Sequence, residues 1–165
     1  MSEHNPYQAP KSTVADKPEP GALAERGQRL GAAVIDGVIG LVFAIPIMWG
    51  LGIWEYAKEG SIPLSVTIMS IVLGLVMFLA AHGYFLRMNG QTIGKKLIGI
   101  RIADLDNRVP EFWRLIALRY LPIMVVSAVP ILGNILIIVD VLFIFRSDRR
   151  CIHDLIAGTR VVRVK

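Results

Sequence analysis

The chain has 165 residues, of which 54% are hydrophobic and 19% are charged, and its formal net charge is +5 at pH 7. This composition excludes a disordered chain and argues against a soluble enzyme of ordinary composition. The basic charge fits either nucleic acid or an anionic membrane surface, and the contiguity of the apolar residues decides for the lipid bilayer, so no nucleic-acid partner is expected. The single cysteine, Cys151, excludes an internal disulfide and a cysteine-based zinc site.

Residues 1–25 are expected to form a disordered cytoplasmic tail, because several prolines stand among polar residues with little apolar content. The segment lacks the positive start and following apolar stretch of a signal sequence. A transmembrane domain is expected over residues 26–163.

Two long apolar segments follow, at residues 30–54 and 62–86. The first contains one charged residue, Asp36, and the second contains no formal charge but includes His82. As a helix each is about 37 Å long, which is enough to cross a hydrocarbon core of about 30 Å with some tilt. We therefore expect two transmembrane helices.

The loop at 87–114 begins with a Gly-rich stretch that a P-loop does not match. A P-loop has four residues between its glycines and then Lys and Ser or Thr, whereas three residues separate Gly90 from Gly94 and Lys96 follows Lys95. Adjacent lysines beside a span attract anionic lipid headgroups by about 1 kcal/mol each. The two lysines are therefore candidates for lipid contact, and the alternative is a plain positive-inside anchor.

Two short segments alternate in the manner of strands, at residues 97–103 and 159–164. We expect two cytoplasmic strands that pair with each other, with a turn at 104–108 after the first. Residues 152–157 are expected to form a short helix that Gly158 ends.

A third apolar stretch runs from residue 115 to residue 145 and is interrupted by turn-forming residues at 130–134. We expect two short helices there, at 112–129 and 134–146. A re-entrant hairpin and a single long tilted span are the alternatives.

Basic residues predict the orientation, because cytoplasmic loops of membrane proteins are enriched in Lys and Arg. The loop at 87–114 and the segment at 146–165 each hold six cationic residues, whereas the loop at 55–60 holds one. Both termini are therefore expected in the cytoplasm, which requires an even number of crossings. The predicted fold is an all-α integral membrane protein of the cell membrane, inner or plasma. It is a small transmembrane helix bundle with four crossings, the last two a short hairpin, and short cytoplasmic strands.

Ionisable residues within the spans are costly and should face a partner or water. Asp36, Arg119, Asp140 and His82 each lie about 8 to 9 Å along a helix from its cytoplasmic end, which places them in one layer. Arg29 lies on the same helix face as Asp36. These side chains form either an interhelical staple or a proton or cation site open to the cytoplasm. Four short crossings leave little room for a full pathway in one protomer, which favours the staple.

No catalytic pattern is present, since the sequence contains neither HExxH nor GxSxG. Cys151 stands near Arg149, Arg150 and His153, cations that lower a thiol pKa, although a lone cysteine is more often incidental. We expect no enzymatic activity, catalytic residue, metal or cofactor.

Three motifs occur in order along the chain. Residues 29–36 read Arg-Leu-x-Ala-x-x-Ile-Asp, residues 90–95 read Gly-Gln-Thr-x-Gly-Lys before a Leu-x-Gly run at 97–102, and residues 153–162 read His-Asp-x-x-Ala-Gly-Thr-x-Val-Val. In these motifs the chain resembles the RDD family, which is named for one arginine and two aspartates, over about residues 26–163.

The resemblance implies an integral membrane protein in which Arg29, Asp36 and Asp154 are the three named positions and Asp140 is a further polar one. Asp154 is expected either to meet Arg29 as an Arg–carboxylate clamp or to cap the turn at 152–157. The family is usually guessed to be one of transporters, and the resemblance supplies no substrate.

Two functions follow as expectations. The first is a proton- or cation-coupled transporter of unknown substrate that works as a homo-oligomer. The second is a non-transporting membrane scaffold that binds a partner or anionic lipid through its basic cytoplasmic face.

Overall fold

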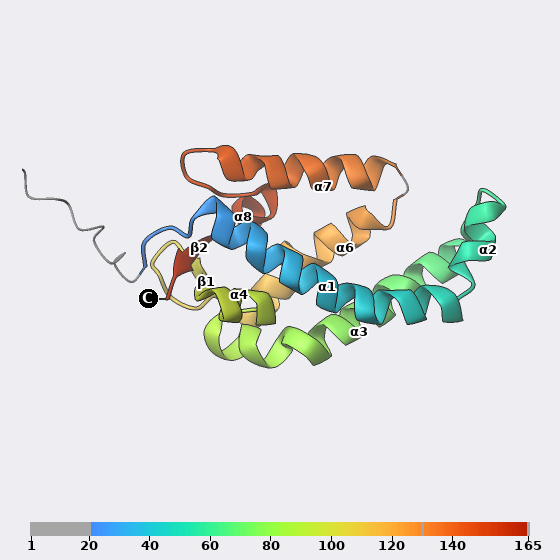
Figure 1. Ribbon diagram of the computed structural model, residues 1–165, viewed down its shortest axis with the longest axis horizontal. Helices are drawn as coiled ribbons and strands as arrows, with labels where there is room; N and C mark the ends of the chain where they lie inside the picture. Colours follow the sequence, from blue (N-terminus) through green and yellow to red (C-terminus); the bar gives the residue numbers. More distant parts are fainter. Residues whose placement is uncertain (1–20, 130, 165) are drawn as a thin grey trace, which may run out of the picture.

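Two long helices form the body of the molecule. The computed structural model describes residues 21–129 and 131–164. In it α1 (Arg26–Gly50) and α3 (Leu64–Asn89) pack against each other and are joined through the short helix α2 (Ile53–Lys58) (Figure 1).

Local signals set the ends of both long helices. The break after α1 contains Gly52, which adopts the left-handed conformation at φ 63°, and α3 lies between Pro63 and Gly90, the latter at φ 66°. Glycine takes this conformation without the steric cost that other residues meet, so it commonly ends helices. The predicted span 30–54 therefore starts and ends later than α1, and the predicted span 62–86 starts and ends earlier than α3.

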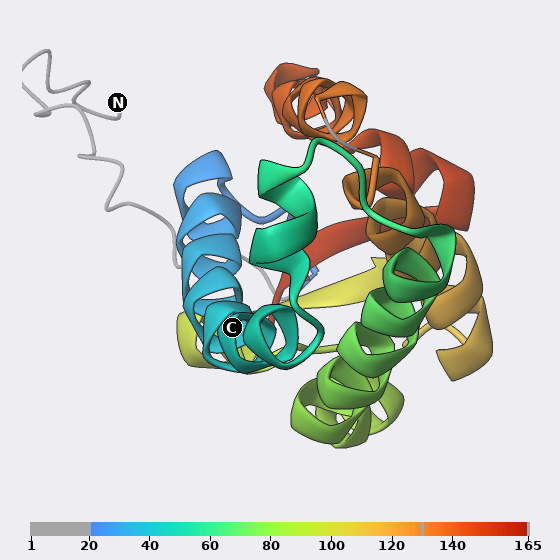
Figure 2. The ribbon, with the colours of Figure 1, turned by 90° about the vertical axis from the view of Figure 1, so that its right-hand side faces the viewer.

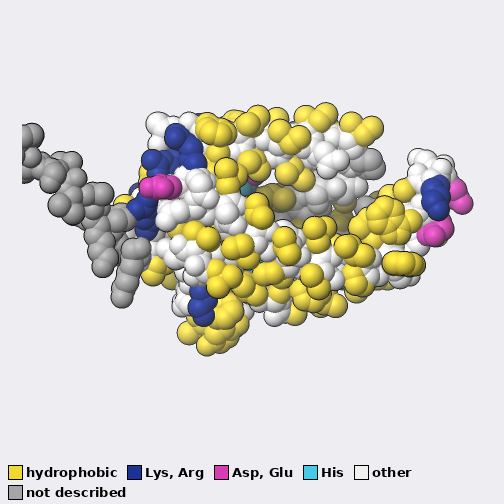
Figure 3. All heavy atoms as spheres, viewed as in Figure 1, with side chains coloured by type: hydrophobic (Ala, Val, Ile, Leu, Met, Phe, Trp, Pro, Cys, Tyr) yellow, Lys and Arg dark blue, Asp and Glu magenta, His cyan; other side chains and the backbone are white. Residues whose placement is uncertain are grey.

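The apolar side chains of these helices face outward. Val34, Leu41 and Val76 are 65%, 58% and 55% exposed, and hydrophobic side chains cover the surface along the helices (Figure 3). Both helices are long and apolar enough to cross a membrane. A core helix of a soluble protein buries such residues, whereas extended exposed apolar surface is typical of contact with lipid or with another protein.

The segment expected to form two further short helices contains two helical units. The first consists of α5 (Phe112–Arg114), the π-helix η1 (Leu115–Tyr120) and α6 (Leu121–Ser127), and the second of α7 (Leu132–Leu142) and the 3-10 helix η2 (Phe143–Phe145).

Two residues account for the shape of this segment. The π-helical register stands next to Pro122, which has no N–H to donate to the carbonyl four residues earlier. Gly133 allows α7 to approach α6, because a Cβ atom there would collide with the carbonyl oxygen of Val126.

A small antiparallel sheet closes one end of the molecule. It consists of β1 (Ile100–Asp104) and β2 (Thr159–Arg163), in a register that pairs Ile102 with Val161. The prediction of two short paired strands is confirmed. The predicted helix at 152–157 is also confirmed as α8 (Ile152–Ala157), which Gly158 ends at φ 62°.

The first strand begins later than predicted because a helix precedes it. α4 (Ile93–Ile98) occupies the start of the segment that was expected to be extended from residue 97. Thr92 caps α4 by accepting a hydrogen bond from the Lys95 N–H at 3.4 Å, and Gly99 ends it at φ 77°. Of the alternating segment at 97–103, Leu97 and Ile98 are therefore helical, and the strand begins at Ile100.

The last residues of the segment expected to be a disordered tail are ordered. Leu23 bridges to Val162 of β2, and Ala24 is fully buried. Residues 21–25 are therefore part of the folded domain, because their backbone continues the pairing of the sheet. Residues 1–20 lie outside the described part of the chain.

Burial is concentrated around the sheet. Two apolar clusters hold it against the helices, one of Ala24, Ala32, Ile100 and Val161, the other of Leu86, Ile102, Leu115 and Ile116. We call this region the sheet end and the opposite extremity the α2 end. In Figure 2, which is viewed from the α2 end, α1, α3, α6 and α7 surround the centre of the molecule, and the sheet lies behind them.

Candidate functional site: a charged layer at the sheet end

Asp154 lies at the centre of a buried ion network. It is fully buried, and its Oδ2 atom accepts a hydrogen bond from Arg29 Nη2 at 2.5 Å. Arg119 Nη1 pairs with its Oδ1 atom, and the Thr159 hydroxyl donates to the same oxygen at 3.1 Å. Burial by itself raises the pKa of Asp154, but the charges of Arg119 and Arg29 outweigh it and hold the pKa far below its usual range.

Several elements bring these groups together. Asp154 stands at the third position of α8, where it also accepts a hydrogen bond from the Cys151 N–H at 3.2 Å. The two roles expected for this carboxylate, clamp of Arg29 and cap of the turn, are thus filled at once. Arg119 comes from the π-helical turn, and its side chain is 3% exposed. Arg29 comes from the first turn of α1 and also donates to the carbonyl oxygen of Arg149.

Asp36 belongs to a second, separate group. Its carboxylate accepts hydrogen bonds from the Thr92 hydroxyl at 2.5 Å and the Gly94 N–H at 2.7 Å, and Lys95 Nζ lies 3.6 Å away. Neither Arg29, which lies on the same face of α1, nor Arg119 of the predicted layer forms an ion pair with this carboxylate. Both guanidinium groups are held by Asp154, and the chain supplies Asp36 with partners from α4 instead.

The second sequence motif explains these contacts. Gly94 is buried against α1, and a Cβ atom there would collide with the Ala32 carbonyl and lie 2.9 Å from Asp36 Oδ1. Gln91 donates to the Ile100 carbonyl at 2.9 Å and so anchors the start of the motif to β1. The Gly-Gln-Thr-x-Gly-Lys pattern is therefore a docking segment that places hydrogen-bond donors around a carboxylate of α1.

The two lysines of this motif behave differently. Lys95 points toward Asp36 and Thr92 and is not available as the headgroup contact that the sequence suggested. The pKa of Lys95 is lowered to about 8, chiefly by burial and also by the charge of the nearby Arg119, against the opposite influence of Asp36. Lys96 is exposed, and its ammonium lies 3.9 Å from the centre of the Phe85 ring, a cation–π geometry.

His82 and Tyr120 border the Asp36 group. His82 is 3% exposed, and its Nδ1 accepts a hydrogen bond from the Ile93 N–H at 3.2 Å. The Phe78 ring lies 5.0 Å from the His82 ring and 4.6 Å from the Tyr120 ring, centre to centre. The Tyr120 hydroxyl is buried and makes no hydrogen bond within the described residues. The sequence analysis named neither Thr92 nor Tyr120 as a site residue. The position of Thr92 within the second motif was a signal that could have found it, whereas Tyr120 had none.

Asp140 forms a third group with α8. Its carboxylate accepts from the His153 N–H at 2.9 Å and lies 2.6 Å from His153 Nδ1, so it does not meet Arg119 as the staple interpretation required. Burial lowers the pKa of His153, and Arg119 lowers it further, against the influence of Asp140. Cys151 was expected to have a lowered thiol pKa, but burial outweighs Arg29 and raises it to about 11.

The ionisable side chains expected to form one interhelical staple instead belong to three groups. Asp154 holds both buried arginines, Asp36 contacts α4, and Asp140 contacts His153. All three lie at the sheet end, where Lys and Arg side chains also gather on the surface (Figure 3).

Fold and site together define a helical membrane protein with a buried arginine–aspartate network at one end. The RDD family model matches residues 23–158, and the chain belongs to the RDD family.

Two relatives share most of their length with this chain. An uncharacterized protein of Haemophilus influenzae is 29% identical over 150 residues, which cover 90% of this chain and 83% of that protein. The uncharacterized protein YckC of Bacillus subtilis is 29% identical over 135 residues, which cover 81% and 80%. No solved structure matches the chain significantly.

Proposed function

We propose that this protein is a proton- or cation-coupled transporter and that the Asp36–Lys95 pair is its coupling site. The observation that carries the proposal is the choice of partners around Asp36. A carboxylate within an apolar helix is held by a hydroxyl, a backbone N–H and an amine, at 2.5, 2.7 and 3.6 Å. An arginine stays charged at every working pH, whereas a lysine amine can lose its proton.

The proton affinity of Lys95 supplies a coupling mechanism. Because its pKa is lowered to about 8, the amine is charged below that pH and mostly neutral above it. A cation that takes the place of the ammonium beside Asp36 favours release of the lysine proton, and protonation of the amine favours release of the cation. The two ions then compete for one carboxylate, which is the requirement for exchange of one against the other.

A cavity on the α2 side of this group supports a route to it. An open cavity of about 420 Å³ lies between α1, α3 and α6, with Gly74 and Met124 among its lining residues. Phe78 lies one helical turn after Gly74, and Tyr120 lies one helical turn before Met124. Both rings are therefore nearer to the sheet end than the cavity is. Their ring contact therefore separates the cavity from the level of Asp36, and we propose that it closes the route in this conformation.

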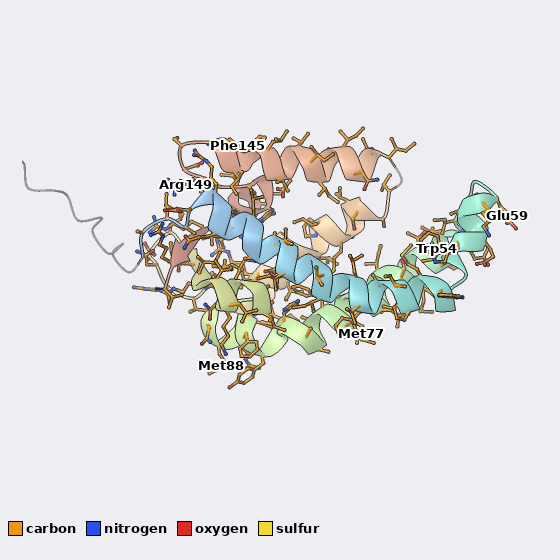
Figure 4. All side chains as sticks on the ribbon, in the orientation of Figure 1. Trp54, Glu59, Met77, Met88, Phe145 and Arg149 are labelled. Atoms are coloured by element: carbon orange, nitrogen blue, oxygen red, sulfur yellow. The ribbon has the colours of Figure 1, made fainter. Side chains whose placement is uncertain are left out.

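We further propose a four-crossing topology with both termini in the cytoplasm. The sheet end carries the cationic groups that favour the cytoplasmic side, including Arg149, while Trp54 and Glu59 lie at the opposite end (Figure 4). The short α7, of 11 residues, is about 16 Å long as a helix, which is less than the thickness of a hydrocarbon core of about 30 Å. We propose that a second copy of the chain packs beside it and that a homo-oligomer completes the pathway.

Ion flux in vesicles that contain only this protein tests the proposal. Asp36→Asn keeps the side-chain shape but cannot ionise, so the variant is expected to fold and to lose pH-dependent flux. Lys95→Arg keeps the charge but cannot release a proton near neutral pH. In the parent protein the cation concentration for half-maximal flux should fall as the pH rises from 7 to 9, and in Lys95→Arg it should stay high.

Two results would contradict the transporter. The first is a parent protein with no flux of protons or monovalent cations between pH 6 and 9. The second is an Asp36→Asn protein that folds and retains the full pH dependence of flux.

A scaffold that binds anionic lipid or a partner is the second candidate, and no enzymatic role is proposed. One observation favours it: Lys96 is exposed, and Lys and Arg side chains gather on the surface of the sheet end (Figure 3). Binding to vesicles with anionic headgroups should then weaken in Lys96→Gln and with added salt, while flux is unchanged or not detectable.

A further inference from the structure

One group of ligand-type side chains has no part in the proposed transport. Asp140 of α7, Cys151 before α8 and His153 within α8 each offer one ligand atom, and these three atoms lie within 4.8 Å of one another. We propose that this group, the α7–α8 cluster, binds a divalent transition-metal ion of the zinc type, against the expectation from the sequence of no metal and no cysteine-based zinc site, because a mixed Asp–Cys–His set needs only one cysteine. The proposal does not depend on the transporter, because none of the three residues contacts Asp36 or Lys95.

The geometry of the cluster is close to what such an ion needs. Zinc bonds of about 2.0 Å to nitrogen and oxygen and about 2.3 Å to sulfur place tetrahedral ligands roughly 3.2 to 3.6 Å apart. The oxygen of Asp140 and the Nδ1 atom of His153 lie 2.6 Å apart, so they need only separate slightly. The sulfur, at most 4.8 Å away, needs to approach by about 1 Å.

Charge and chemical type also suit a metal of this kind. Carboxylate, imidazole and thiolate are all zinc ligands, and a thiolate excludes the hard ions Mg²⁺ and Ca²⁺ as good occupants. The Asp140 carboxylate and the Cys151 thiolate together carry two negative charges, which balance a divalent ion. The nearby Asp154, Arg29 and Arg119 together carry one net positive charge, so both anionic ligands are needed to hold the ion beside this cationic group.

The surroundings complete the site in two ways. His153 Nε2 lies 3.7 Å from Asp154 Oδ2, so an approach of about 0.5 Å would let this carboxylate orient the imidazole through its other nitrogen. An open cavity of about 170 Å³ is lined by Asp140 and His153 and leaves room for a water molecule as the fourth ligand. Arg29 Nη2 lies 3.4 Å from the sulfur and stabilises its thiolate form once the metal displaces the thiol proton to solvent.

Cobalt(II) is a suitable probe, because its absorption reports both coordination geometry and thiolate ligation. The purified full chain in detergent is titrated with Co²⁺, and then with Zn²⁺. We expect intense visible bands of tetrahedral cobalt, a thiolate-to-cobalt charge-transfer band in the near ultraviolet, and loss of both bands when zinc is added.

Variants identify the ligands. Cys151→Ser should abolish the charge-transfer band, and His153→Gln and Asp140→Asn should each weaken binding at least tenfold. Asp148→Asn is the matched control, since Asp148 is an exposed acid of the neighbouring loop that pairs with Arg146. Its spectrum and affinity should equal those of the parent.

A second measurement needs no variant. Cys151 is the single cysteine of the chain, so its rate of alkylation by a thiol reagent reports on this site alone. Zinc should slow alkylation of the parent protein at least tenfold, while Mg²⁺ should leave the rate unchanged. The proposal is overturned if zinc leaves the alkylation rate unchanged, or if Cys151→Ser retains the charge-transfer band.

Discussion

At the scale of single residues, Asp154 decides how the charges of the molecule are arranged. It accepts hydrogen bonds from four groups, two of them buried guanidinium groups, and it is fully buried itself. Arg29 and Arg119 would each be stranded without it, since removing one member of a buried ion pair leaves an uncompensated charge. The carboxylate is therefore the centre of the network, and each arginine is one of its two partners.

This arrangement predicts an order of severity among substitutions. Asp154→Asn leaves two buried arginines unpaired, whereas Arg29→Gln leaves Asp154 paired with Arg119. Removing one partner of such a pair costs about 3–5 kcal/mol, so Asp154→Asn should lower folded yield and thermal stability in detergent more than Arg29→Gln does. Arg146→Gln, at an exposed pair, is the control and should change stability little. Equal loss in the Asp154 and Arg29 variants would show that Arg119 does not share the carboxylate.

At the scale of elements, the docking of α4 on α1 builds the Asp36 site. Gly94 permits this contact, because the backbone of α4 passes closer to the Ala32 carbonyl than any side chain would allow. Gly37, one position after Asp36 on α1, meets nothing within 4 Å of an added Cβ atom. The two glycines therefore differ in their structural roles, and in the sequence they differ in that Gly94 belongs to the second motif whereas Gly37 belongs to none.

The difference can be measured with a pair of alanine substitutions. Gly94→Ala should destabilise the protein by about 1–3 kcal/mol through overpacking, and it should displace the hydrogen bonds to Asp36. Gly37→Ala should be neutral or stabilising by up to about 1 kcal/mol, because alanine favours a helix more than glycine does. Thermal unfolding of both variants in one detergent is the measurement, and a Gly94→Ala protein as stable as the parent would argue against the close packing of α4.

At the scale of the whole molecule, the distribution of burial matches a protein solvated by lipid. Buried apolar clusters lie at the sheet end, while the long helices expose their apolar faces along the rest of the molecule (Figure 3). The cationic groups sit beyond the apolar region on the side of the sheet, where water and lipid headgroups can solvate them.

The proposed topology makes a direct prediction about the two ends of the molecule. A reporter fused after Lys165 that is active only outside the cell membrane should be silent, because the sheet end is placed in the cytoplasm. The same reporter inserted at Gly60, in the loop that follows α2, should be active. An active reporter at the C-terminus together with a silent one at Gly60 would reverse the proposed orientation, and activity at both sites would contradict an even number of crossings.

Local patterns in the sequence were enough to predict the class of molecule and several of its elements. Long runs of apolar residues predict helices that lipid can solvate, because hydropathy and length depend on no distant contact. The pair of short strands and the α8 helix were predicted for the same reason, since alternation and a terminating glycine are local signals. The helix α4 was not predicted, and its last residues, Leu97 and Ile98, were assigned to a strand because their apolar alternation continues into β1.

Which charged side chains pair with each other depends on how distant elements pack. Sequence spacing placed Arg29 and Asp36 on one face of α1, but the free energy of burying a charge depends on every group that surrounds it. α8 brings Asp154 to both arginines, and α4 brings Lys95 and two hydrogen-bond donors to Asp36. Arg29 and Arg119 lie 125 and 35 residues from Asp154 in the sequence. Their pairing therefore follows from the packing of distant elements and not from any local pattern.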